Sequence, residues 1–307
     1  MYHRHSYLRK GCVVQASGSG SPEAVEVPCY SIASVFTPAT KRGKGYARHM
    51  MRLLHWIIAP HSSLPPFPEN WGMPPSSTGN AKFSVLYSGI GDFYSACGPK
   101  AESGEGWTIK RAVETIFDVS KVRLESVEEE LGEWEWLDIP GVHELSIEET
   151  EVIKKDVIQS TISTGRTSFT FLPGTMAGGL IYYVLCSPLL PHINKWGAVL
   201  KDSLSAKEGK PHTFATWVVE QGPSSLRLII TCLRATRVTF PHLLRKLLEV
   251  AANYDIPNVE LFNLPDELVE VAGQFGGKTE EGHDDLPAFK WYGDEKAEEV
   301  DWLFDEK

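Results

Sequence analysis

The hydrophobic period of the chain changes abruptly at residues 42–47, RGKGYA, and this change constrains the fold more than any other feature. Before it, residues 24–37 (AVEVPCYSIASVFT) alternate and are rich in β-branched side chains, which predicts a strand. After it, apolar side chains follow a helical spacing from residue 44 to residue 59, and Pro60 ends the pattern. The sequence therefore predicts a strand, a flexible basic loop and a helix in direct succession.

Further elements are predicted on both sides of this unit. A strand at residues 12–15 precedes it, and the glycine- and serine-rich residues 16–23 between the two strands predict a hairpin connection. The six prolines of residues 60–80 predict a long surface loop. Residues 82–88 (KFSVLYS) then predict a strand, and residues 89–98 (GIGDFYSACG) a short helix closed by glycine.

The second half repeats this order of elements without repeating the sequence. Helices are predicted for residues 240–254, with Thr239 as N-cap and Pro241 in the first turn, and for residues 265–275. The charged tail is expected to fray. Strands are predicted for the segments SFTFL, IYYVLC, TFATWVVE, SLRLIITCLRA, NVELFN and LPAFKWYG.

Residues 99–150 separate the two halves and differ from both. They are acidic and aromatic with weak periodicity, and we expect them to form a linker in which Leu145 to Ser160 are helical. The expected domains are therefore residues 1–98 and residues 151–307. Strands that alternate with helices in this way build mixed α/β (α+β) sheets flanked by helices.

The charge and the cysteines argue against several classes of function. A formal net charge of -10 without a basic stripe makes nucleic acid an unlikely partner. The five cysteines are scattered, which fits neither a disulfide framework nor a zinc site and indicates a reducing compartment. The N-terminus lacks the apolar core of a signal peptide, and the run Leu180–Cys186 is too short to span a bilayer. We expect a cytoplasmic protein with no metal site, and His3 and His5 to be part of a disordered end.

Three interpretations of the loop at residues 42–47 remain in competition. It can be a turn and a helix start without a ligand. The spacing of a triphosphate-binding loop is absent, as is G-x-G-x-x-G, so that interpretation is set aside. The third is a pyrophosphate cradle: the helix N-terminus offers unpaired N–H groups, Gly43 and Gly45 allow close approach, and Arg42 with Lys41 or Lys44 adds charge-assisted hydrogen bonds.

The segment VFTPATKRGKGYARHMM resembles motif A of the GNAT superfamily of N-acetyltransferases, R/Q-x-x-G-x-G/A. The matching residues are Arg42, Gly43, Lys44, Gly45, Tyr46 and Ala47. FSVLYSGIGDFYSACG is similar to motif B, with Tyr94 and Gly98 in its tyrosine and glycine positions. More narrowly, these segments resemble the fungal lysine N-acetyltransferases. The superfamily has a strand, two helices and a further strand ahead of the hairpin at which this chain begins, so we expect the first domain to be a partial GNAT domain.

The resemblance implies transfer of an acetyl group from acetyl-CoA to a small amine, with lysine N6 as the expected acceptor and no metal. Val35, Phe36 and Thr37 would line the pantetheine arm, and the loop from Arg42 to Ala47 would hold the pyrophosphate. The second half, residues 151–307, is expected to be a GNAT-like domain that lacks the loop glycines and does not bind CoA. The alternative is a paralogue that binds CoA or a partner protein without turnover. The oligomeric state is left open.

The resemblance also implies catalytic roles, each of which has a structural alternative. Tyr94 would be the general acid for the departing thiolate; a half-buried helix aromatic is the alternative. Glu26 is a candidate base, although an exposed carboxylate or a water chain fits as well. Cys97 is expected to be a packed cysteine. Trp134 and Trp136 fit an amphipathic strand better than an aromatic cage.

Overall fold

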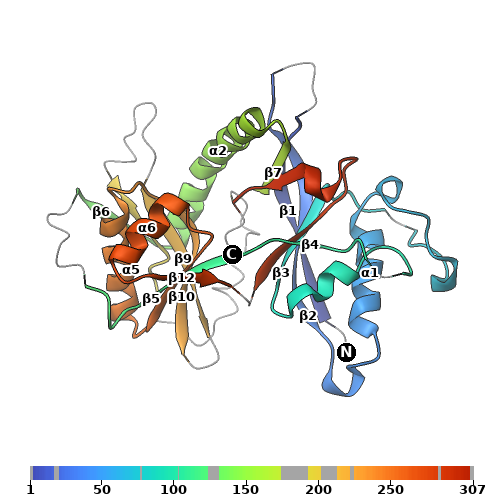
Figure 1. The fold of residues 1–307 in the computed structure, drawn as a ribbon, viewed down its shortest axis with the longest axis horizontal. Coiled ribbons are helices and arrows are strands. Elements are labelled where there is room, and N and C mark those ends of the chain that lie inside the picture. Colours follow the sequence, from blue (N-terminus) through green and yellow to red (C-terminus); the bar gives the residue numbers. More distant parts are fainter. Residues whose placement is uncertain are drawn as a thin grey trace. The chain divides into compact units, whose positions relative to one another are not determined.

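The computed structural model describes residues 3–16, 21–76, 78–102, 104–123, 131–173, 193–201, 213–221, 225–282 and 285–304. The predicted strand over IYYVLC lies outside these residues. The chain forms two compact units (Figure 1). Unit 1 comprises Met1–Arg111, Glu149–Ala177 and His283–Asp305, and unit 2 comprises Ala112–Glu148, Gly178–Gly282 and Glu306–Lys307.

Within the described residues, unit 1 is built on a seven-stranded mixed sheet of order β14-β7-β1-β2-β3-β13-β4. Neighbouring strands are antiparallel except for the pairs β2–β3 and β14–β7, which are parallel. A parallel pair needs a crossover, and helix α1 (Tyr46–Ile58) supplies it between β2 and β3. The strands are β1 (His3–Val14), β2 (Val25–Phe36), β3 (Phe83–Ser88), β4 (Thr108–Ile109), β7 (Thr167–Phe171), β13 (Leu286–Trp291) and β14 (Val300–Trp302).

The two faces of this sheet carry different cores. On one face, the apolar side of α1 packs on β2 and β3, with Met51 and Leu54 buried against Ile32 and Leu86. The other face is aromatic, and its buried rings are Phe83, Phe169, Phe289, Trp291 and Trp302. Successive residues of a strand point to opposite faces, which is why Leu86 joins the first core and Phe83 the second.

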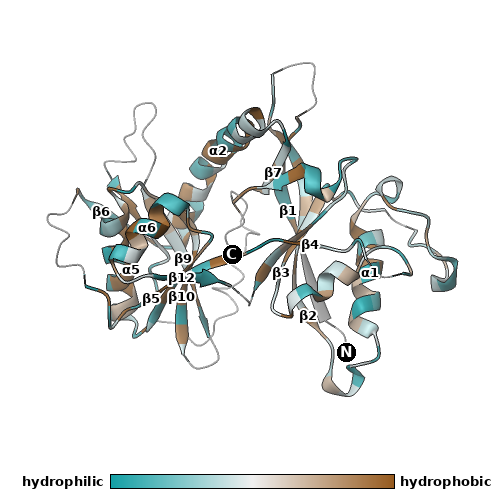
Figure 2. Cartoon of the chain, in the orientation of Figure 1, coloured by the Kyte–Doolittle hydropathy of each residue, from teal (hydrophilic) through white to brown (hydrophobic). Residues whose placement is uncertain are grey.

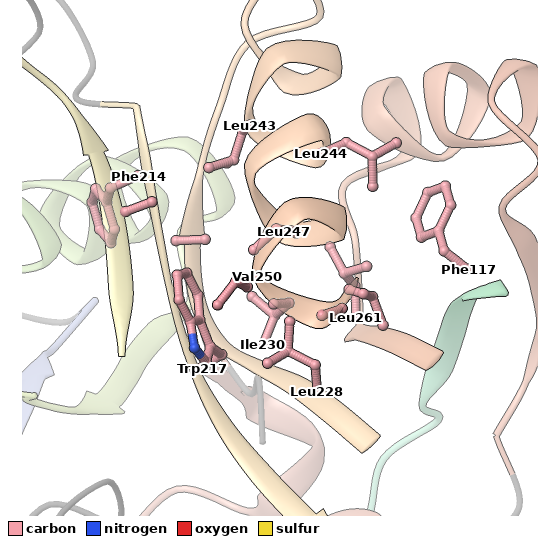
Figure 3. Packing of buried hydrophobic residues seen from close by; sticks show 14 of the residues in the cluster. Phe117, Phe214, Trp217, Leu228, Ile230, Leu243, Leu244, Leu247, Val250 and Leu261 are labelled. Carbon is pink, nitrogen blue, oxygen red and sulfur yellow. The ribbon is translucent and has the colours of Figure 1, made fainter. Parts of the chain in front are cut away.

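Unit 2 has a second seven-stranded sheet in the described residues, of order β12-β5-β11-β10-β9-β8-β6. Its one parallel pair among them, β10–β11, is connected by helix α5 (Phe240–Asn253), and α6 (Asp266–Gln274) follows β11. Figure 3 shows Leu247 and Val250 of α5 beside Trp217 and Ile230 of this sheet, and Leu244 on the side of Phe117. The strands are β5 (Val113–Asp118), β6 (Trp134–Leu137), β8 (Gly197–Leu200), β9 (Phe214–Gln221), β10 (Leu226–Arg234), β11 (Asn258–Phe262) and β12 (Lys278–Glu281).

The mixed α+β class predicted from the sequence is confirmed, but the units do not follow the expected boundaries at residues 98 and 150. Residues 99–150 contain β4, β5 and β6 and the start of helix α2 (Ile139–Thr164), where a linker was expected. Hydrophilic and hydrophobic residues alternate along α2 (Figure 2). Strands β4 and β13 are neighbours in the sheet of unit 1, although two segments of unit 2, Ala112–Glu148 and Gly178–Gly282, lie between them in sequence.

Residues 91–96 form a short 3-10 helix inside the segment predicted to be a short helix. The tail differs from its prediction: it was expected to fray but forms β14, in which Val300 and Trp302 are buried. Within the described part of the chain, no helix is long and apolar enough to cross a membrane. The short 3-10 turns are η1 (Ala39–Lys41), η2 (His61–Ser63), η3 (Glu69–Trp71), η4 (Gly91–Ala96) and η5 (Ala297–Glu299).

Candidate functional site

The parallel strands β2 and β3 stop pairing before either strand ends. Their last pair is Ile32 with Leu86, whereas β2 continues to Phe36 and β3 to Ser88. On its other side, β2 has a bulge, because its register with β1 shifts between Ala33 and Phe36. Ser34, inside the bulge, has a left-handed backbone (φ 55°). A bulge bends its strand, and so the carboxyl end of β2 runs on without β3 as a partner.

The loop between β2 and α1 follows this end directly. Gly43 (φ 73°) and Gly45 (φ 77°) both have left-handed backbones, which favour glycine, and a Cβ at either position would meet nothing within 4 Å. Gly45 is the N-cap of α1 and offers no capping side chain. No side chain at the N-cap therefore occupies the N–H groups of the first turn of α1, and uncapped helix N-termini of this kind bind anions.

Basic side chains surround the same loop. Lys41, Arg42 and Lys44 are all exposed. The Nε of Arg42 donates to the carbonyl of Thr37 (3.0 Å), and its guanidinium lies 6.0 Å from the centre of the Phe36 ring. These contacts tie the loop to the end of β2, so the structure brings the two predicted groups of binding residues together.

The remaining predicted binding residues occupy the rim of this region. Val35 is half-buried, Phe36 is 47% exposed and Tyr46 is exposed, while small Ala47 lies half-buried in the first turn of α1. The hydroxyl oxygen of Thr37 is buried and has no hydrogen-bond partner among the described residues. Such a buried hydroxyl needs a partner, and a ligand lying along β2 would provide one.

Tyr94 lies in turn η4, on the α1 face of the sheet, and is only 7% exposed. Burial raises the pKa of Tyr94 to about 12, with a smaller contribution from neighbouring Cys97. The phenol is therefore protonated at neutral pH. Its hydroxyl makes no hydrogen bond to any residue that the structure describes, so it can donate to a ligand. The main-chain carbonyl of Tyr94 accepts from the N–H groups of Cys97 and Trp107 (both 3.1 Å).

A buried polar network that the sequence did not reveal lies beside Tyr94. The Nε2 of His55 is 2.9 Å from the Cys97 carbonyl, which can only accept, so Nε2 carries the proton. Nδ1 therefore accepts from the hydroxyl of Tyr292 (2.7 Å). That hydroxyl accepts in turn from Ser84 (3.3 Å), and the Ser84 oxygen accepts from the indole N–H of Trp107 (3.0 Å). The four hydrogen bonds can therefore all run in one direction, from the Trp107 indole through Ser84 and Tyr292 to His55 and the Cys97 carbonyl.

This network positions Tyr94 through Trp107. The His55 ring stacks on the indole of Trp107 with centroids 4.3 Å apart, and Trp107 contacts the Tyr94 ring edge-on at 6.3 Å. Burial lowers the pKa of His55 to about 3, and burial also raises the pKa of Tyr292. Both groups are neutral at pH 7, so the network holds the turn without a buried charge. His55 lies in α1, Ser84 in β3, Trp107 just before β4 and Tyr292 just after β13. No local sequence pattern links these four positions.

Glu26 does not join the other candidates. It lies at the start of β2, ten residues and therefore roughly 33 Å of extended chain from Phe36. Its carboxylate pairs with Lys154 (2.9 Å) and Lys10 (3.1 Å), and these hydrogen bonds lower its pKa. The structure therefore does not place the Glu26 carboxylate near the end of β2.

The other candidate residues, Cys97, Trp134 and Trp136, make packing contacts. Cys97 is buried, and burial raises its pKa to about 11, which disfavours a nucleophilic thiolate. Trp134 and Trp136 lie in β6 and pack on the core of unit 2. Among the residues that the structure describes, no group of three His, Cys, Asp or Glu side chains could hold a metal ion.

Comparison with known proteins gives a family match over most of the chain. Residues 119–307 match the family described as "LYC1 GNAT-like C-terminal domain". No curated protein sequence matches the chain.

Several solved structures resemble the chain at low identity. A GCN5-related N-acetyltransferase from Kribbella flavida has 12% identity and a TM-score of 0.44, with 94% of this chain and 57% of that one covered. Eis1 from Mycobacterium abscessus has 11% identity and a TM-score of 0.44, with 95% and 62% covered. A tandem GNAT protein from the clavulanic acid biosynthesis pathway has 11% identity and a TM-score of 0.39, with 91% and 82% covered. The chain spans about three fifths of the length of the first two.

The neutral network predicts a specific sensitivity to acid. Because the pKa of His55 is about 3 in the folded chain and about 6.5 in the unfolded chain, the unfolded state binds the extra proton between these values. We expect the free energy of unfolding to fall by about 1.4 kcal/mol per pH unit from this group as pH drops below about 6. Urea denaturation between pH 7 and pH 4.5 measures the slope.

The matched variants are His55→Phe, which keeps a ring on Trp107, and His49→Gln, which changes an exposed histidine of the same helix. His55→Phe should be less stable at pH 7 but show a shallower slope, whereas His49→Gln should keep the wild-type slope. An unchanged slope in His55→Phe would contradict a neutral buried imidazole.

Proposed function

The chain belongs to the family of the LYC1 GNAT-like C-terminal domain, and on that premise we propose that unit 1 transfers an acetyl group from acetyl-CoA to a small amine, with free lysine as the first candidate acceptor. The observation that carries the proposal is the early end of β2–β3 pairing beside the uncapped start of α1. One group of residues is strand backbone beyond its last pair with β3, and the other is a helix start that no N-cap side chain occupies. An extended ligand with an anionic end fits both.

The loop from Arg42 to Ala47 would hold the pyrophosphate. The N–H groups at the start of α1 point to the anion, and the helix dipole favours negative charge there. Gly43 and Gly45 keep the approach open, since a Cβ at either position lies in open space. Arg42 and Lys44 add charge-assisted hydrogen bonds from the rim.

The end of β2 would hold the pantetheine arm. Val35 to Thr37 continue beyond the last pair with β3, and backbone groups left by the missing strand can pair with an amide-containing arm. The buried Thr37 hydroxyl supplies an additional polar partner. Acetyl-CoA, once bound, supplies an acetyl group activated as a thioester. The amide of Val35–Phe36 would hydrogen-bond the carbonyl oxygen as negative charge develops on it.

Tyr94 would hydrogen-bond the departing sulfur and act as general acid. Its high pKa keeps the phenol protonated throughout the physiological range, so it is always available as a donor. The network of His55, Tyr292, Ser84 and Trp107 would fix its position. The amine must lose a proton before attack, and Glu26 is too far along β2 to take it directly, so water is the better candidate.

Unit 2 repeats the strand–helix–strand order but would not bind CoA. Before α5, the hydroxyl of Thr239 accepts from the N–H of Thr236 (2.9 Å), and Thr236 and Thr239 occupy each other's polar groups. Arg237, the basic residue of this connection, is paired with Glu270 (2.7 Å). The start of α5 thus differs from that of α1 in its loop: it has no glycine between β10 and α5, its basic residue is paired, and Pro241 in its first turn has no N–H group to offer an anion.

Acetyl-CoA binding tests the loop directly. We expect the wild type to bind acetyl-CoA in calorimetry, and the double variant Gly43→Glu, Gly45→Glu to weaken binding by more than about tenfold, since both changes bring negative charge to the anion site. Gly276→Glu is the matched control, because Gly276 also has a left-handed backbone in open space but lies in unit 2.

Equal weakening by the Gly276→Glu control, or no binding by a folded wild type, would contradict the proposed loop function. Binding without release of free thiol in the presence of amines would instead favour a protein that binds CoA without turnover.

Tyr94→Phe separates binding from chemistry. Loss of the hydroxyl should lower kcat about a hundredfold, because general acid catalysis typically contributes that much, and leave the Kd for acetyl-CoA unchanged. Tyr254→Phe, a hydroxyl lost from unit 2, is the control. Release of free thiol with lysine as acceptor measures kcat. A Tyr94→Phe rate equal to that of the wild type would remove Tyr94 from the mechanism.

A further inference from the structure

The segment that follows turn η4 is held by side chains of helix α1. Residues 97–102 belong to no helix or strand, so their carbonyls have no regular ladder of N–H groups to pair with. The Nε2 of His55 donates to the carbonyl of Cys97 (2.9 Å), and the indole N–H of Trp56 donates to the carbonyl of Pro99 (3.1 Å). Helix α1 therefore supplies donors that the segment itself lacks.

Arg52, on the same helix, holds both ends of this segment with one guanidinium. Its Nη1 donates to the carbonyl of Ala101 (2.7 Å). Its Nη2 donates to the carbonyls of Ala96 (3.3 Å) and Glu102 (3.2 Å). Ala96 is the last residue of η4, so Arg52 ties the end of the turn to the far end of the segment. A planar guanidinium fixes several acceptors in one geometry, which a lysine ammonium does not.

The backbone around the segment is packed closely on Tyr94. The N–H of Cys97 donates to the Tyr94 carbonyl (3.1 Å). A Cβ at Gly106 would lie 2.1 Å from that same carbonyl oxygen, and a Cβ at Gly98 would lie 2.0 Å from the carbonyl oxygen of Gly104. Only glycine fits at such distances. Because close-packed groups transmit a displacement to their neighbours, a shift of the segment held by α1 also shifts Tyr94.

Helix α1 thereby connects the two parts of the candidate site. The loop of residues 42–47 leads into its start, and Gly45 is its N-cap. Arg52 lies seven residues after Gly45, roughly 10 Å along the helix axis. One regular element therefore carries the proposed pyrophosphate loop at its start and, through Arg52, the turn of the proposed general acid at its side.

We propose that Arg52 is a positioning residue for Tyr94, and that it sets the distance between the phenol and the thioester of acetyl-CoA bound at the start of α1. The inference rests on the proposed acetyl transfer for the identity of the reaction. As the carbon–sulfur bond breaks, the proton passes from the Tyr94 oxygen to the sulfur, and Arg52 exchanges no proton. Trp107 contacts the Tyr94 ring, whereas Arg52 holds the main chain that follows the turn.

A double-mutant cycle tests whether Arg52 acts through Tyr94. Arg52→Met keeps an unbranched stem and removes all three hydrogen bonds. We expect it to lower kcat about tenfold, because small misplacements of a catalytic group are costly, and to change the Kd for acetyl-CoA by less than about twofold. In the Tyr94→Phe background the same change should lower kcat by less than about twofold, since residues that act as a unit are not additive. Arg52→Lys should recover part of kcat, and Arg48→Met, which removes an exposed arginine of the same helix, is the control.

Amide hydrogen exchange separates this inference from the proposed function, because it needs no turnover. The N–H groups of Cys97 and Trp107 both donate to the Tyr94 carbonyl. We expect Arg52→Met to speed their exchange and to leave helix α5 of unit 2 unchanged, and Arg48→Met to change neither. Faster exchange in a chain that transfers no acetyl group would support the hold of Arg52 on the turn and overturn the acetyl transfer. Unchanged exchange, or equal losses of kcat in the wild-type and Tyr94→Phe backgrounds, would overturn the role of Arg52 alone.

Discussion

The early end of pairing between β2 and β3 is the constraint on which the rest of unit 1 depends. The bulge at Ser34 and Val35 carries β2 away from its neighbour, while α1 must still return the chain to β3. That crossover places an uncapped helix start, two left-handed glycines and three exposed cations beside the unpaired strand end. A ligand with one anionic group and one amide-containing arm would satisfy both sets of backbone groups at once.

The buried polar network on the α1 face of the sheet is neutral. His55, Tyr292, Ser84 and Trp107 form a hydrogen-bonded chain in the core without any charge, and it supports the turn that carries Tyr94.

Elements with long, regular hydrophobic periods could be predicted from the sequence. Short strands, and contacts between segments far apart in the sequence, could not. β2, α1, β3 and α5 were predicted because each carries a clear period and a clear stop. Inside residues 99–150, β4 and β5 were missed, because β4 has two residues, too few to show alternation, and β5 lies in a stretch of weak periodicity. β6 was indicated by the alternation of Trp134 and Trp136 with glutamates. The predicted binding loop is a local motif and could be recognised, whereas the four residues of the neutral network, spread from position 55 to position 292, meet only through the sheet order.

Hydrogen–deuterium exchange of the backbone amides tests the central claim most directly, because unit 2 provides an internal comparison with the same strand–helix–strand order. The account predicts that acetyl-CoA slows exchange at the end of β2 and at the start of α1, over residues 35–48, and leaves residues 234–241 before and at the start of α5 unchanged. Protection of residues 234–241, or no protection of residues 35–48 at saturating acetyl-CoA, would contradict it.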